Sequence, residues 1–179
     1  NAQFIGVLSF DTGSLGLDPA DFIERAELRL SRGSLRGDIS ALGNLNVDMR
    51  CLAWENPFFG QSELLEPADF QAATFFNSVA TVSQVGMSFS FAAELDETGR
   101  ENINRDGLTQ MKLRFDLDDN DNDNADYISF FSGNTGTASR RPTLLLWVRF
   151  AEEAREPGLI QVPVETPDMD STGDRIVRQ

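Results

Sequence analysis

The chain has 179 residues, of which 40% are hydrophobic, and its formal net charge is −14 at pH 7. This length and composition suit one folded domain with a substantial core. The negative charge argues against nucleic acid as a partner, because phosphates would be repelled. The absence of histidine excludes Ser-His-Asp and Cys-His nucleophile systems. No apolar run reaches transmembrane length, so we expect no membrane insertion.

Alternation of hydrophobic and polar residues, the pattern of half-buried strands, recurs along the chain. In chain order it predicts strands at 4–11, 23–31, 45–54, 85–91, 111–117, 127–131 and 143–150. Helix is expected only as short turns near 67–73 and 98–101. Seven or more short strands with polar connections predict an all-β, antiparallel sandwich. The long excursion between Trp54 and Val85 favours the crossing connections of a jelly roll.

The composition changes after Phe150. Residues 151–179 contain three prolines and many charges, which is typical of an extended tail or linker. We therefore expect a β-sandwich domain at 1–150 and a separate tail. The most strand-like piece of this tail has three alternating hydrophobic residues: Ile160, Val162 and Val164. The proline between the last two would confine such a strand to a sheet edge.

Six aspartates crowd the connection that follows the predicted strand 111–117: Asp116, Asp118, Asp119, Asp121, Asp123 and Asp126. Carboxylates this close repel one another unless they spread into water or share a cation. Three of them have the one-three-five spacing of a calcium loop, although the glycine and glutamate of an EF-hand are absent. We predict a calcium site here. The alternative is an Asx-rich turn, in which these side chains bind their own backbone.

Five aromatic residues are candidates for contact with a ligand or partner: Trp54, Phe58, Phe59, Tyr127 and Trp147. Exposed rings stack on sugars and anchor subunit contacts. For the pair at 58–59, the alternative is a loop that caps the core. Leu145 and Trp147 point away from the core face of their strand, which predicts a surface covered by a loop or by another subunit. Arg140 and Arg141 are expected either to neutralise the acidic loop or to recognise a sugar acid.

Nothing in the sequence indicates catalysis. The glutamates that could act in pairs lie in no recognisable glycosidase motif. The single cysteine, Cys51, alternates with Val47 and Met49, which predicts a buried apolar thiol. We therefore expect that the protein is not an enzyme.

Seven segments, in order from about residue 4 to residue 150, are informative together: GVLSFDTGSL, AELRL, GNLNVDM, EPADFQAA, INRDGLTQMKLRF, LDDNDNDNADYISFFSGN and SRRPTLLLWV. They resemble a bacterial family of secreted β-sandwich modules, the DNRLRE-type domains related to carbohydrate-binding module family 96. The resemblance implies a jelly roll in an extracellular or cell-surface protein. For some members it implies binding of acidic polysaccharides, and it implies no catalytic residues.

Members of that family begin with additional strand-forming sequence ahead of the segment that matches GVLSFDTGSL. Without it, an unpaired sheet edge is expected, which a strand from a neighbouring copy could complete. We therefore expect first a structural module that self-assembles into a filament or surface layer, with 159–164 or the region of Ile176 as the donor strand. The alternative is a carbohydrate-binding module that recognises a polysaccharide, with calcium as a candidate cofactor. A third reading is a fragment of a larger cell-surface protein.

Overall fold

The computed structural model describes residues 5–50, 58–59, 66–87, 89–151 and 157–164. Within these ranges the chain forms ten strands and one short α-helix, α1 (Glu97–Glu101). The strands are β1 (Gly6–Asp11), β2 (Phe22–Arg36), β3 (Leu45–Arg50), β4 (Phe76–Thr81), β5 (Ser83–Gln84), β6 (Ser90–Glu94), β7 (Leu108–Phe115), β8 (Tyr127–Phe130), β9 (Thr143–Arg149) and β10 (Gly158–Pro163). Single 3-10 turns occur at η1 (Gly13–Leu15), η2 (Ile39–Leu42), η3 (Pro67–Phe70) and η4 (Ala138–Arg140).

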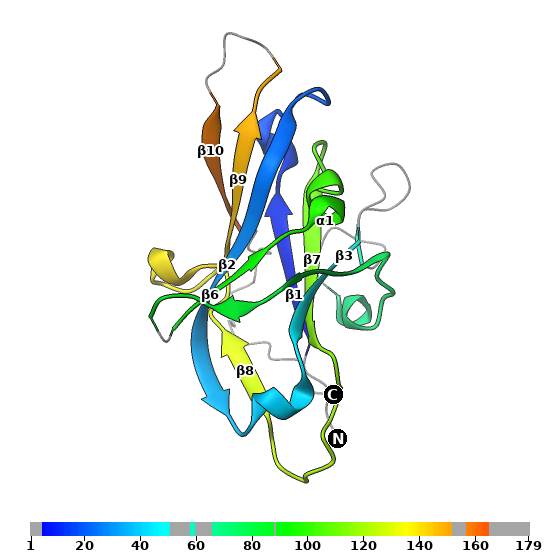
Figure 1. Cartoon of the computed structure of the whole chain (residues 1–179), viewed down its shortest axis with the longest axis vertical. Coiled ribbons are helices and arrows are strands. Elements are labelled where there is room, and N and C mark those ends of the chain that lie inside the picture. The colour runs from blue at the N-terminus through cyan, green and yellow to red at the C-terminus, as the bar shows by residue number, and fades with distance from the viewer. Residues whose placement is uncertain (1–4, 51–57, 60–65, 88, 152–156, 165–179) are drawn as a thin grey trace.

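The strands form two antiparallel sheets (Figure 1). The four-stranded sheet has the order β1-β7-β3-β4, and the six-stranded sheet has the order β10-β9-β2-β6-β5 with β8 paired to the far half of β2. β2 is 15 residues long and runs through nearly the whole length of the molecule, so it can pair with β9, β6 and β8. The predicted all-β class with two antiparallel sheets is confirmed, and the jelly-roll assignment stays a prediction.

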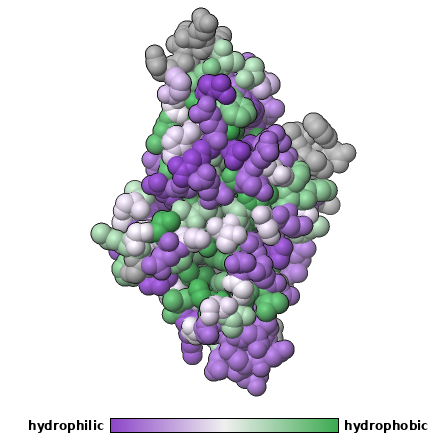
Figure 2. Space-filling view, viewed as in Figure 1, coloured by the Kyte–Doolittle hydropathy of each residue, from purple (hydrophilic) through white to green (hydrophobic). Residues whose placement is uncertain are grey.

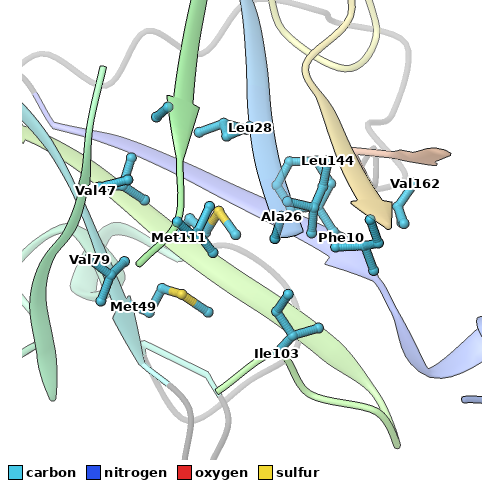
Figure 3. Close-up of a cluster of buried hydrophobic side chains, with 14 of the residues drawn as sticks. Phe10, Ala26, Leu28, Val47, Met49, Val79, Ile103, Met111, Leu144 and Val162 are labelled. Atoms are coloured by element: carbon cyan, nitrogen blue, oxygen red, sulfur yellow. The ribbon is translucent and has the colours of Figure 1, made fainter. Parts of the chain in front are cut away.

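The core lies between the sheets and follows the alternation in the sequence. In β2 the core residues Ala26 and Leu28 alternate with the outward polar residues Glu27 and Arg29. In β9 the core residues Leu144 and Leu146 alternate with Leu145 and Trp147 on the outer face. Met111 of β7 faces them from the other sheet and is fully buried (Figure 3). Period-two burial of this kind fixes the register, because a slip of one residue would turn each hydrophobic side chain to solvent.

The strand β10 belongs to this chain's own sandwich. It pairs with β9, with Val162 opposite Leu144, and Val164 forms a bridge to Phe10 of β1. Val162 and Val164 are buried in the core, and Ile160 packs against it. Residues 158–164, which the sequence placed in a separate tail, therefore close one side of the two-sheet core. Ile176 lies outside the described residues.

Two elements differ from the predictions. The predicted strand 85–91 is wrong as a single strand, because the chain turns at Gly86, where φ is +61°. Across this turn the N–H of Val85 donates to the carbonyl of Ser90 at 2.8 Å. The strand β4 was not predicted at all. Its sequence, FNSVAT, buries only two neighbouring residues, Val79 and Ala80, so it lacks the alternation that marks the other strands.

Candidate functional site

Two adjoining hollows lie on the outer face of the six-stranded sheet. One has a volume of about 480 Å³ and the other about 250 Å³, and both are lined by Ser31 of β2 and Ser90 of β6. Figure 1 shows the flanking η4 segment and the β5–β6 turn projecting on the same side of the molecule. We call these hollows together the arginine groove, after the four arginines that line them: Arg29, Arg32, Arg140 and Arg141.

The fold brings these arginines together from two distant parts of the sequence. Arg29 lies between the buried Leu28 and Leu30, so the alternation of β2 turns it outward. Arg32 lies where β2 leaves β6 and begins to pair with β8. Arg140 ends η4 and Arg141 follows it, in the short connection to β9, which pairs with β2.

Contacts with aromatic rings hold two of the guanidinium groups in place. The guanidinium of Arg32 lies 5.3 Å from the centre of the Phe89 ring, and that of Arg140 lies 4.9 Å from the centre of the Phe131 ring. Such contacts orient a cation without neutralising its charge. The Phe89 side chain is 60% exposed, so part of its ring is also open to a ligand.

The groove is positive although the chain as a whole is strongly acidic. No aspartate or glutamate among the described residues lines either hollow. Among the described residues, Arg29 is the one groove arginine with an ion pair, because its Nε donates to Glu27 at 2.6 Å. Arg141 donates instead to the carbonyl of Thr135. The planar fork of a guanidinium matches a carboxylate well, so this arrangement suits an anionic ligand.

The predicted acidic cluster forms the β7–β8 connection, at the lower hydrophilic end of the molecule (Figures 1 and 2). Its two end residues, Asp116 and Asp126, anchor it to the fold. Asp116 accepts the backbone N–H of Asn44 at 2.8 Å, and Asp126 accepts that of Asp38 at 2.6 Å. In both cases the residue before the donor is a glycine with positive φ.

Close approach explains these glycines. Gly43 has a φ of +80°, and a Cβ there would lie 2.7 Å from an oxygen of Asp116. Gly37 has a φ of +72°, and a Cβ there would overlap the carboxylate of Asp126. Only glycine combines this backbone conformation with room for the carboxylate. The ends of the acidic loop are therefore fixed by pairs of residues that lie far apart in the sequence.

The anchoring hydrogen bonds give the fold a defined dependence on acid. The N–H of Asn44 and the side chain of Asn46 lower the pKa of Asp116, and the N–H of Asp38 and the side chain of Asn122 lower that of Asp126. A carboxylate with a lowered pKa stabilises the fold above its ordinary pKa of about 4, and this contribution is lost as pH falls through the folded-state value.

We therefore predict that Asp116→Asn is less stable than the native chain at pH 7 and that the difference shrinks below about pH 4. Urea unfolding at several pH values measures it. A difference between the two proteins that stays constant down to about pH 2 would contradict the assigned cause.

Between its anchors, the loop is a run of Asx turns, which was the alternative to a calcium site. The backbone N–H of Asp121 binds the side chain of Asp119, and the N–H of Asn124 binds that of Asn122. Asp121 and Asp123 have positive φ values of 53° and 56°. In the described part of the chain, no group of three or more His, Cys, Asp or Glu residues is arranged to hold a metal. Calcium at Asp116–Asp126 stays a prediction.

The predicted aromatic contacts are dispersed. Phe59 is buried, with its N–H bound to Gln110 and its ring 4.5 Å from Nζ of Lys112, so it caps the outer face of the four-stranded sheet. Trp147 is half-buried beneath the guanidinium of Arg25, 4.4 Å from the ring centre. Phe58 and Tyr127 are half-buried and do not line the groove. Trp54 lies outside the described residues.

Sequence reasoning singled out two of the four groove arginines as candidates for ligand binding. It proposed that Arg140 and Arg141 bind a sugar acid or neutralise the acidic loop. In the described residues they contact Phe131 and Thr135, and β8 pairs with β2 rather than with β9, which keeps them away from the loop. Arg29 and Arg32 were missed. The available signal was their place on the outward face of β2 in a chain with 14 arginines and one lysine.

No family model, curated protein or solved structure matches this chain. Among the described helices, none is long and apolar enough to cross a bilayer. The function is therefore inferred from the chemistry of the groove.

Proposed function

We propose that this protein is a non-catalytic extracellular module that binds an anionic polysaccharide in the arginine groove. The observation that carries the proposal is the concentration of four arginines, with no carboxylate among the described lining residues, on a chain whose net charge is −14. A polyanion is repelled by the net negative charge of the chain and attracted at the groove. This contrast directs the ligand to one site.

The groove offers the groups that a carboxylated sugar requires. Arg140 and Arg141 are exposed and adjacent, so they can bind neighbouring carboxylates of one polymer. The exposed Phe89 ring can stack on the apolar face of a sugar. Ser31 and Ser90, shared by both hollows, supply hydroxyl groups for the sugar hydroxyls. The same ligand class is implied by the family resemblance in the sequence.

Neutralising two groove arginines should weaken binding. We expect Arg140→Gln/Arg141→Gln to bind a polyuronate at least about tenfold more weakly, the loss of roughly two exposed charge contacts. Affinity electrophoresis or calorimetry measures it, and added salt should weaken binding by the native chain. The control is Arg105→Gln/Arg149→Gln, which makes the same charge change outside the groove. Arg105 donates to the backbone carbonyl of Asp18, and Arg149 forms an ion pair with Glu24.

Two results would refute the proposal. One is equal binding of a neutral glucan and a polyuronate, which would remove the role of charge. The other is equal weakening by the groove variant and by the control, which would show that net charge rather than the groove determines binding.

Self-assembly by strand exchange is the second candidate function. The observation that favours it is the position of β10, which lies at a sheet edge and, among the described strands, pairs only with β9. Val162 in this strand and Val164 directly after it are nevertheless buried. An edge strand with these properties can complete the sheet of a neighbouring copy in the same register. We propose this exchange as the route by which the module would form a homo-oligomer or filament.

A further inference from the structure

We infer that copies of this chain associate head to tail, with the acidic loop of one copy in the arginine groove of the next. The part of the acidic loop that would enter the groove is residues 118–123, between the anchoring aspartates. This inference rests on the proposed function, because both use the affinity of the groove for carboxylates. It adds a partner, a second copy of the chain, and a form of regulation, since a polysaccharide and the loop would compete for one groove.

The loop presents carboxylates in a fixed arrangement. Its ends are anchored by Asp116 and Asp126, and the Asx turns between them order its backbone. Asp121 and Asp123 are exposed, and their carboxylates accept no hydrogen bond from the described residues. A ligand segment that is ordered before it binds loses less conformational entropy on binding.

The groove is the complementary surface. Three of its guanidinium groups, those of Arg32, Arg140 and Arg141, have no carboxylate partner among the described residues. Within the described part of the chain, the lining of these hollows contains no negative side chain that the loop of a second copy would meet. The charges of the two surfaces are opposite, and among the described residues Asp121 and Asp123 on one, and three arginines on the other, form no ion pair within their own copy.

The positions of the two surfaces determine the kind of assembly. Figure 1 shows the β7–β8 connection at the lower end of the molecule, whereas η4 and the β5–β6 turn project from its side. A single head-to-tail contact therefore leaves the groove of one copy and the loop of the other free. A third copy can bind at either free surface, so the association can continue from copy to copy.

Salt should affect this association in both directions. Copies with a net charge of −14 repel one another when screening is weak. At about 0.1 M salt the screening length is near 10 Å, which reduces the long-range repulsion while direct carboxylate–guanidinium contacts persist. At about 1 M salt these contacts weaken too. Association through the loop and the groove should therefore be strongest at intermediate salt. Oligomers held together by exchanged β10 strands would instead persist at high salt.

A mixing experiment by sedimentation velocity tests the inference at about 0.1 M salt. The native chain should form oligomers. The loop variant Asp121→Asn/Asp123→Asn and the groove variant Arg140→Gln/Arg141→Gln should each be monomeric. Their mixture should form a 1:1 dimer and nothing larger, because it combines one intact loop with one intact groove. Glu97→Gln/Glu101→Gln, which neutralises two exposed carboxylates on α1, should associate like the native chain.

A polyuronate should dissociate the native oligomers, and the loop variant should bind it at least as tightly as the native chain does. Two results would overturn the inference: a native chain that stays monomeric at every salt concentration, or a mixture of the two variants that forms no dimer. If the native chain still bound the polyuronate, the proposed function would stand. Oligomers that form through the loop in a chain without affinity for polyuronate would overturn the proposed function alone.

Discussion

Replacement of Val162 with aspartate should lower the free energy of unfolding by about 3–5 kcal/mol, because it places a carboxylate without a partner in the core. Val162 is 2% exposed and lies opposite Leu144 in the β9–β10 ladder. The control on the same strand is Leu159→Asp. Leu159 is 57% exposed, so this change should stay within about 0.5 kcal/mol. Denaturant unfolding of both variants measures the difference.

The same unfolding experiment distinguishes a strand within one chain from a strand exchanged between copies. If β10 completes its own sheet, the unfolding midpoint of the native chain is independent of protein concentration. If copies exchange β10, the midpoint rises with concentration, because association stabilises the folded state by mass action. Val162→Asp would then also abolish association. Equal, small effects of the two aspartate substitutions would show that β10 does not belong to the core.

Gly37→Ala should cost more than the left-handed backbone conformation alone, which accounts for about 1–2 kcal/mol. The further loss follows from the overlap of the new Cβ with Asp126, because the carboxylate must move and release the N–H of Asp38. Thermal or urea unfolding measures the loss.

Gly86→Ala isolates the first of these two costs. Gly86 also has a positive φ, +61°, but an added Cβ there would meet nothing within 4 Å. Its substitution should therefore cost about 1–2 kcal/mol. If the two alanine variants were equally stable, the contact between residue 37 and Asp126 would be irrelevant to stability, and the acidic loop would not be anchored as described.

The sequence predicts best those elements whose hydrophobic residues alternate. Such alternation identified β2, β9 and β10, because each presents a hydrophobic face to one core. It could not identify β4, where Val79 and Ala80 are consecutive and both buried. It also could not reveal that β10 pairs within its own chain, since the partner of an edge strand depends on the connection before it and not on its own residues.

The candidate site was harder to predict because it depends on tertiary contacts. The aspartates at 116–126 are conspicuous in the sequence, but the anchoring role of Asp126 depends on Gly37 and Asp38, which precede it by almost ninety positions. The groove combines Arg29 with Arg141, from opposite ends of the chain. Local patterns report which way a side chain points and do not report which distant segment it will meet.

The bridge between Phe10 and Val164 has a consequence for biogenesis. The first and last described strands are in contact, so the interior cannot be enclosed until residue 164 has been made. At roughly 5–20 residues per second, translation leaves β1 waiting for many seconds before its partner emerges. During this interval the apolar faces of β2 and β9 are available to other nascent chains. We therefore expect this protein to need a holding chaperone during synthesis, and to fold slowly once it is released, as proteins with long-range pairing do.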